Sequence, residues 1–159
     1  MLLNGGNLYE PSMVKQDQPK LINSVHLNPD HIKSVMDGME AVVYSKKGTG
    51  RSVRRIADVK MAGKTGTSQV FSTKGSIDYK NEEMPEHLRD HAVFSGYAPM
   101  DNPQVAITVF VENGGSGSSV AAPIAQKLAN KFAEKYIHNE PTTEVSLVVE
   151  SNNKNKTNS

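Results

Sequence analysis

Two apolar segments separated by a turn constrain the fold of this chain more than any other feature. HAVFSGYAP, residues 91–99, and QVAITVFVEN, residues 104–113, are rich in β-branched and aromatic residues, and Met100 to Pro103 join them. Such runs on either side of a turn predict an antiparallel β-hairpin. Both faces of the second run carry apolar or small residues, so we expect Val105 to Val111 to be a central strand covered on both sides.

An amphipathic helix is predicted before this hairpin. Asn28 can cap it, Pro29 suits its first position, and Asp30 suits the positive end of its dipole. We expect Gly48 to end it, after two lysines at its negative end. Apolar residues at helical spacing predict one core face: Ile32, Val35, Met36, Met39, Val42 and Val43.

A second helix is predicted over residues 120–138, with one apolar stripe: Ile124, Leu128, Phe132 and Tyr136. Residues 139–159 form a polar tail that ends in SNNKNKTNS and is expected to be disordered. At the other end, MLLNGG resembles the last turn of a helix ended by glycine, and residues 7–25 predict a loop with one brief strand at Leu21 and Ile22.

Bulk composition excludes several classes of function. The 159 residues carry a formal net charge of +1, which gives no global attraction to nucleic acid or to an anionic membrane. There is no cysteine, so disulfides, thiolate metal sites and a cysteine nucleophile are excluded. We see no membrane-spanning run and no signal peptide. The basic segment KKGTGRSVRR, Lys46 to Arg55, lacks aromatic residues, which favours a solvated loop or a site for an acidic substrate group over nucleic acid.

The segment MAGKTGTSQVF, Met61 to Phe71, lies in a predicted strand and carries a Gly-Lys-Thr triplet. A phosphate-binding loop would need a glycine five residues before Gly63, and Asp58 occupies that position, which argues against a nucleotide site. The alternative is the K-[ST]-G box of enzymes that acylate a serine.

Acyl transfer needs positive potential beside the nucleophile, an anchor for the substrate carboxylate and an oxyanion site. Lys64 supplies the charge, while the hydroxyls of Thr65 and Thr67 share one face because strand side chains alternate. Lys64 and Gly66 belong to the other face, so a local distortion would have to bring Lys64 into the same cleft. Gly66 removes a side chain that would block the substrate backbone.

Three segments in order, KTGTSQVF, HLRDH and FSGYAPMDNPQVAITVFVENGG, resemble the C-terminal part of the transpeptidase domain of the penicillin-binding protein 2 family, bacterial cell-elongation D,D-transpeptidases. The resemblance implies an α+β fold of the serine β-lactamase/D,D-transpeptidase type. Residues 1–138 would be the C-terminal portion of that domain, holding the third to fifth strands of its antiparallel sheet with flanking helices.

The resemblance also implies roles for four residues and a set of partners. Lys64 would be catalytic, Thr65 and Thr67 would bind the substrate carboxylate beside Gly66, and the amide of Thr67 would form half of the oxyanion hole. No cofactor or metal is implied. The partners would be stem peptides ending in D-Ala-D-Ala, β-lactams, the upstream remainder of the domain and elongation-complex proteins, on the periplasmic side of the inner membrane.

The family also needs S-x-x-K, which carries the nucleophile, and S-x-N. Ser12 to Lys15 fits S-x-x-K letter for letter, but it precedes a proline-punctuated loop instead of opening a helix; Ser151 to Lys154 fits in the polar tail. We therefore expect the isolated chain to be inactive, as a portion of a transpeptidase. The alternative is a non-catalytic module that uses the same strand to bind stem peptides or a protein partner by strand addition.

His87 and His91 are spaced as in the H-E-x-x-H zinc motif, but leucine replaces the glutamate and no third ligand is evident. We favour a structural hydrogen-bonded cluster of Arg89, Asp90 and His91 over a metal site. Asn113 to Gly115 could cradle an anion, and a turn after a strand explains the same letters more simply.

Overall fold

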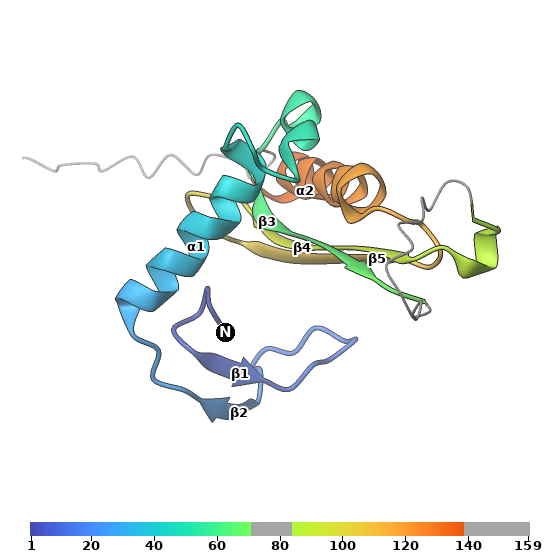
Figure 1. Ribbon diagram of the computed structural model, residues 1–159. Coiled ribbons are helices and arrows are strands. Elements are labelled where there is room, and N and C mark those ends of the chain that lie inside the picture. The colour runs from blue at the N-terminus through green and yellow to red at the C-terminus, as the bar shows by residue number, and fades with distance from the viewer. Residues whose placement is uncertain (71–83, 139–159) are drawn as a thin grey trace, which may run out of the picture.

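A computed structural model of the chain describes residues 1–70 and 84–138 (Figure 1). The polar tail, with Ser151 to Lys154, and residues 71–83 of the excursion before the hairpin lie outside the described residues. Three strands form the main sheet in the order β3-β4-β5: β3 (Ala62–Ser68), β4 (His91–Ala98) and β5 (Val105–Val111), all antiparallel. The predicted hairpin is confirmed as β4 and β5.

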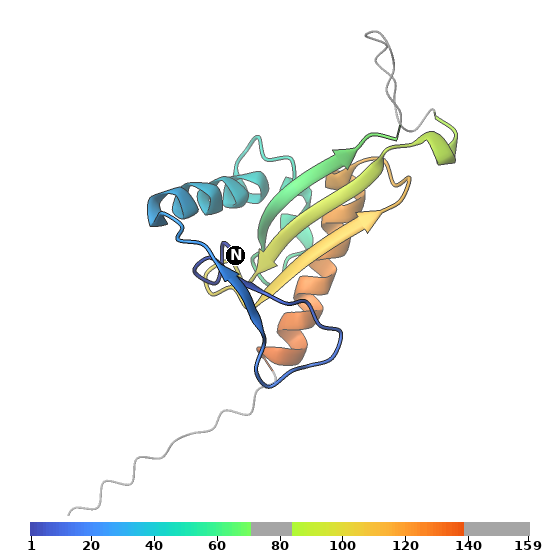
Figure 2. The same cartoon turned by 90° about the horizontal axis from the view of Figure 1, so that it is seen from below.

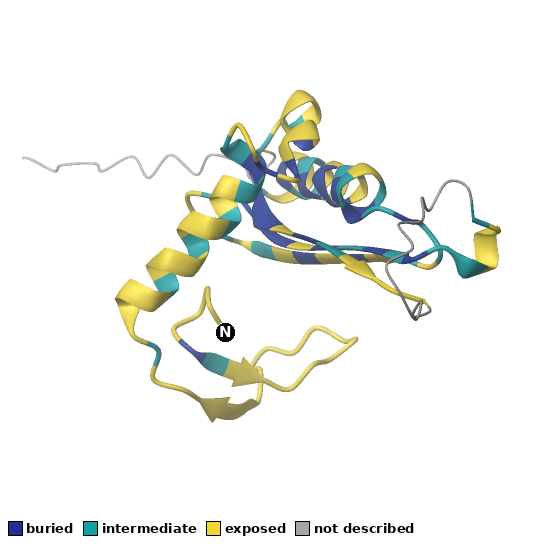
Figure 3. Cartoon of the chain, in the orientation of Figure 1, coloured by how far each residue is buried: buried dark blue, intermediate teal, exposed yellow. Residues whose placement is uncertain are grey.

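The prediction of a central, doubly covered strand at β5 is wrong for the described chain. β5 is an edge of the three-stranded sheet, and its burial alternates (Figure 3). Ile107 and Val109 are buried on one face, whereas Phe110 on the other face is 58% exposed. One layer of helix covers the sheet, and the opposite face is left largely open (Figures 1 and 2).

The covering helix is α2 (Ala122–Tyr136), which continues from a π-helical turn, η4 (Gly117–Ala121). Its buried side is made of small residues and one glutamine: Ala122, Ala125, Gln126, Ala129 and Ala133. The predicted stripe is therefore not the buried face, since Ile124, Leu128 and Tyr136 are 41%, 51% and 51% exposed. Alanines let the helix backbone approach the sheet closely, so that Phe94 of β4 fills the space between them.

Helix α1 (Pro29–Tyr44) begins where the sequence predicts: the side chain of Asn28 accepts a hydrogen bond from the backbone N–H of Asp30 at 2.8 Å. It ends at Tyr44, so Lys46 and Lys47 lie beyond its last turn. The predicted core face is only partly formed, because Val43 is the one buried residue of the helix and Val35 is 46% exposed.

The N-terminal residues form a small separate sheet instead of a helical turn. β1 (Asn7–Tyr9) pairs antiparallel with β2 (Leu21–Ser24), so one of the two strands was missed by the sequence reading. Gly5 and Gly6 have φ angles of +69° and +90°, and a side chain on Gly6 would overlap the carbonyl of Val25. The glycines end no helix; they turn the chain into β1.

The core packs β3 against α1 and η4, and it includes Val53 of a 3₁₀ helix, η1 (Arg51–Ile56). Met61, Phe94, Val43 and Val53 are among the largest fully buried side chains. Among the described helices, none combines the length and the apolar character needed to cross a membrane.

Candidate active-site strand

The KTGT segment lies on β3, and its register against β4 decides where each side chain points. Lys64 is opposite Ser95, Thr65 opposite Phe94, and Thr67 opposite Ala92. Directly paired residues of antiparallel strands share a face. Thr65 and Thr67 therefore lie on the α2 side with Phe94, while Lys64 and Gly66 lie on the open face, as the alternation of strand side chains predicts.

Lys64 is exposed, and its Nζ donates to the carbonyl oxygen of Thr65 at 2.5 Å. The ammonium group is thus held against the strand backbone, beside the threonines that face the other way. Whether Lys64 enters the same cleft as the hydroxyls of Thr65 and Thr67 stays a prediction.

Thr65 differs from Thr67 in its surroundings. Thr65 is 9% exposed, and its hydroxyl lies 2.7 Å from that of Thr49, in the loop that follows α1. Thr67 is exposed. A ligand in solution can reach the ammonium of Lys64 and the hydroxyl of Thr67 directly, whereas the hydroxyl of Thr65 is already hydrogen-bonded.

The glycines of β3 are required for different reasons. A Cβ on Gly63 would overlap the ring of Phe94 and lie 2.6 Å from the carbonyl oxygen of Ser95, so packing demands glycine there. A Cβ on Gly66 would lie 3.4 Å from the Cβ of Val93, close to ordinary contact. The described packing therefore does not itself require glycine at position 66.

The open face carries a polar row that the sequence reading did not single out. Ser95 is opposite both Lys64 and Thr108 in the register, and the hydroxyls of Ser95 and Thr108 lie 3.1 Å apart. The alignment of both residues with Lys64 depends on the strand register, which the sequence pattern alone did not give. The row borders a cavity of about 720 Å³ that Met39 and residues 1–4 close from the other side.

Tyr97 also lines this cavity, on the same face of β4 as Ser95. Burial raises the pKa of its phenol, and the carboxylates of Glu40 and Asp37 raise it further. Tyr97 therefore remains neutral beside the polar row.

A comparison with known families now decides which kind of protein carries this strand. The family model described as "Penicillin binding protein transpeptidase domain" matches residues 1–130 of the chain. The chain belongs to the penicillin-binding protein transpeptidase family.

Individual transpeptidases agree with this assignment. The chain is 37% identical over 142 residues to peptidoglycan D,D-transpeptidase MrdA of Haemophilus influenzae, covering 83% of this chain and 22% of that protein. It thus spans about a fifth of the length of that relative. A crystal structure of Pseudomonas aeruginosa PBP2 matches 92% of this chain and 31% of its own, with a TM-score of 0.67 and 34% identity. A complex between PBP2 and MreC from Helicobacter pylori matches 84% of this chain and 23% of its own, with a TM-score of 0.64 and 28% identity. The expected α+β transpeptidase fold is confirmed.

His87 and His91 do not form the helical pair that a zinc motif requires. His87 lies in the 3₁₀ turn η3 (Glu86–Leu88), and His91 is the first residue of β4. The Nδ1 of His91 accepts from the backbone N–H of Asn113 at 2.9 Å, and its ring centroid lies 5.1 Å from that of Phe110. Within residues 1–70 and 84–138, no three His, Cys, Asp or Glu side chains gather as metal ligands would.

Arg89 and Asp90 bind neighbouring backbone in the same region. The Nε of Arg89 donates to the carbonyl of Met84 at 3.0 Å, and the Oδ1 of Asp90 accepts from the N–H of Val70 at 3.4 Å. The bond to Asp90 holds Val70, just after the end of β3, and the cluster of Arg89, Asp90 and His91 stays a prediction.

Ser12, the first serine of an S-x-x-K match, lies in an exposed loop between β1 and β2. Its hydroxyl donates to the carbonyl of Val14 at 2.7 Å and accepts from the N–H of the same residue at 3.2 Å. No helix begins there, so the structural setting of a transpeptidase nucleophile is absent at this serine.

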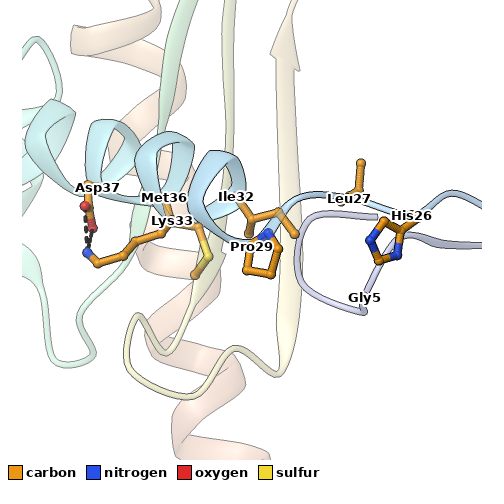
Figure 4. A pocket seen from close by; sticks show the side chains of 8 residues that line it. All are labelled: Gly5, His26, Leu27, Pro29, Ile32, Lys33, Met36 and Asp37. Carbon is orange, nitrogen blue, oxygen red and sulfur yellow. Dashed lines mark hydrogen bonds and ion pairs between the residues drawn. The ribbon is translucent and has the colours of Figure 1, made fainter.

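A second cavity, of about 490 Å³, lies between α1 and the N-terminal segment (Figure 4). Ile32, Met36 and Leu27 give it an apolar lining, and Lys33 pairs with Asp37 at its rim at 2.7 Å. The hydrogen bond to Asp37 raises the pKa of Lys33. The cavity shares no residue with the KTGT segment or the polar row.

Proposed function

We propose that β3 is the active-site strand of a peptidoglycan D,D-transpeptidase that cross-links stem peptides ending in D-Ala-D-Ala and is acylated by β-lactams. The observation that carries the proposal is the position of Lys64. Lys64 lies on the open face of the sheet, in one row with Ser95 and Thr108. Its strand belongs to a chain that the transpeptidase family model matches.

In this proposal each KTGT residue has a separate task. The ammonium of Lys64 provides positive potential at the site of acyl transfer, where developing negative charge is stabilised most effectively by fixed donors. The exposed hydroxyl of Thr67 binds the substrate carboxylate, and its backbone N–H forms half of the oxyanion hole.

Thr65 can take part without losing its contact to Thr49. A hydroxyl has one donor and two acceptor positions. Thr65 can therefore accept from Thr49 across the 2.7 Å separation and donate to a substrate carboxylate at the same time. Gly66 leaves room for the substrate backbone along the strand.

The serine nucleophile, in this proposal, comes from a part of the transpeptidase domain that these residues do not include. Ser12 is bonded within its own loop and has no helix to position it. The 159-residue chain alone is then a D,D-transpeptidase portion without acylating activity.

Intact mass spectrometry of the purified chain after incubation with excess benzylpenicillin tests this. We expect no added mass, and the same result for the Ser12→Ala variant. A stoichiometric adduct that the Ser12→Ala substitution abolishes would contradict the proposal, because Ser12 would then be the nucleophile of a complete acylating enzyme.

We further propose a periplasmic location at the inner membrane and an elongation-complex partner of the MreC kind. The support is the solved complex between PBP2 and MreC from Helicobacter pylori, which matches 84% of this chain. Co-purification of the tagged chain with MreC from its own host is the direct measurement. If neither the chain nor a full-length relative retains MreC, the proposed partnership is refuted.

A further inference from the structure

The basic residues of the segment Lys46 to Arg55 have no part in the proposed acyl transfer, although Thr49 of the same segment contacts Thr65. It contains five basic residues and no acidic one, in a chain whose formal net charge is only +1. The structure folds the second half of it into the 3₁₀ helix η1, which begins just after the loop carrying Thr49. Three of the five basic residues, Arg51, Arg54 and Arg55, lie on η1.

Two cavities open along η1, and we call them the η1 cavities. The first, of about 560 Å³, lies between the loop after α1 and the start of the α2 helical segment, with eight lining residues: Lys47, Gly48, Thr49, Arg51, Ser52, Ser118, Ser119 and Pro123. The second, of about 380 Å³, is lined by Arg51, Ser52, Arg54 and Arg55. They share Arg51 and Ser52, and neither lining contains an acidic residue.

The cations of the η1 cavities are not neutralised within the described part of the chain. Arg51 donates one Nη to the carbonyl of Lys46 at 3.1 Å, and Arg54 donates to the carbonyls of Arg51 and Tyr44 at 3.3 and 3.2 Å. These bonds fix the guanidinium groups but leave their charge uncompensated. Other lysines differ: Lys20, Lys33 and Lys131 each pair with a carboxylate.

Hydroxyl groups complete the first cavity. Ser52 donates to the carbonyl of Ser118 at 3.4 Å, which joins η1 to the turn before α2. Thr49 and Ser119 add two more hydroxyls to the lining. Guanidinium and ammonium groups combined with hydroxyl donors are the set that proteins use to hold phosphate oxygens.

We propose that the η1 cavities bind a ligand with two linked phosphate-type groups, one in each cavity, with Arg51 between them. The shared lining residues place the two positive subsites next to each other, as a diphosphate or a phosphodiester chain requires. Such a ligand can be soluble or can be the headgroup of an anionic lipid. The site does not depend on the function proposed for β3.

Calorimetric titration of the full chain with inorganic pyrophosphate at low ionic strength tests the proposal. We expect saturable binding that Arg51→Gln and Lys47→Gln each weaken about tenfold, the loss of one charge-assisted contact. Lys33→Gln is the matched control, because it removes the same charge from α1 outside the η1 cavities. A thermal melt of each variant shows that it is folded.

A second experiment, co-sedimentation of the chain with vesicles containing phosphatidylglycerol, distinguishes a lipid headgroup from a soluble ligand. Vesicle binding that depends on Arg51 and Lys47 supports a lipid headgroup, and pyrophosphate binding alone supports a soluble ligand. Absence of saturable binding in both arms, equal losses in Lys33→Gln, or equal affinity for the dicarboxylate glutarate would each overturn the proposal.

Discussion

The hydroxyl oxygens of Thr49 and Thr65 lie 2.7 Å apart and join the loop after α1 to the KTGT strand. This contact between the side chains of β3 and of the loop after α1 is buried on the β3 side, since Thr65 is 9% exposed. The orientation of Thr65 thus depends on a residue outside the KTGT motif.

Replacing Thr49 with valine keeps the shape of the side chain and removes its hydroxyl. We expect the free energy of unfolding to fall by about 1 to 2 kcal/mol, because the buried hydroxyl of Thr65 loses its partner. Urea denaturation measures this. Thr67→Val, on the exposed part of the same strand, is the control and should change stability by less than about 0.5 kcal/mol; an equal effect in both variants would show that the Thr49 contact contributes nothing of its own.

Asn130 of α2 fastens the segment between η1 and β3. Its Nδ2 donates to the carbonyl of Ile56 at 2.7 Å, and its Oδ1 accepts from the N–H of Asp58 at 3.1 Å and from Nε2 of Gln126 at 2.8 Å. Asn130→Ala should lower the free energy of unfolding by about 2 kcal/mol, since several partners lose a bond at once.

The neighbouring Lys131 offers a matched control for Asn130. Lys131 forms an exposed ion pair with Glu134, the kind that contributes little to stability. Lys131→Ala should therefore change the free energy of unfolding by less than about 0.5 kcal/mol. If thermal melts show both alanine variants equally stable, the hydrogen bonds of the Asn130 side chain do not stabilise the fold.

Gly63 and Gly66 should respond differently to alanine. Gly63→Ala forces a methyl group into the ring of Phe94, so we expect a loss of about 3 kcal/mol of stability. Gly66→Ala has room beside Val93 and should stay within about 1 kcal/mol of the parent chain. Chemical denaturation of the two variants compares them, and a Gly66→Ala variant as unstable as Gly63→Ala would mean that packing alone explains the motif glycine.

Phe110 exposes 58% of its surface on β5, the edge strand of the sheet that the described residues form. Open apolar edge strands promote association between chains. Phe110→Thr should reduce light scattering of the concentrated chain at constant temperature, whereas Tyr136→Thr on the exposed side of α2, which removes a residue that is 51% exposed, should not. Equal reductions would indicate that exposed apolar area in general, and not the β5 edge, causes association.

Local sequence signals predicted the elements that local chemistry determines. Asn28 and Pro29 located the start of α1, and the two apolar runs located the β4-β5 hairpin. The ordered segments around the KTGT motif also identified the family. These features depend on neighbours in sequence, which is why they can be read without a structure.

Other features depend on what covers each surface, which local patterns do not specify. Leu128 is apolar and lies on a helical stripe, yet α2 packs through its alanines because they allow closer contact with β4. The sequence pattern predicted that Val105 to Val111 are covered on both faces, whereas in the described part of the chain one layer of helix lies on the sheet. The pair Ser95 and Thr108 became visible only through the strand register.

The most direct test of the central claim, that β3 is an active-site strand organised around Lys64, is the acylation rate of a chimera. In it, the matched segment of the Haemophilus influenzae relative is replaced by that of this chain, and labelling by a fluorescent penicillin is followed with time. We predict labelling of the chimera, a loss of about 100-fold or more for Lys64→Ala, and a change within about twofold for the exposed neighbour Lys60→Ala. Labelling of the Lys64→Ala chimera at the unsubstituted rate would contradict the account.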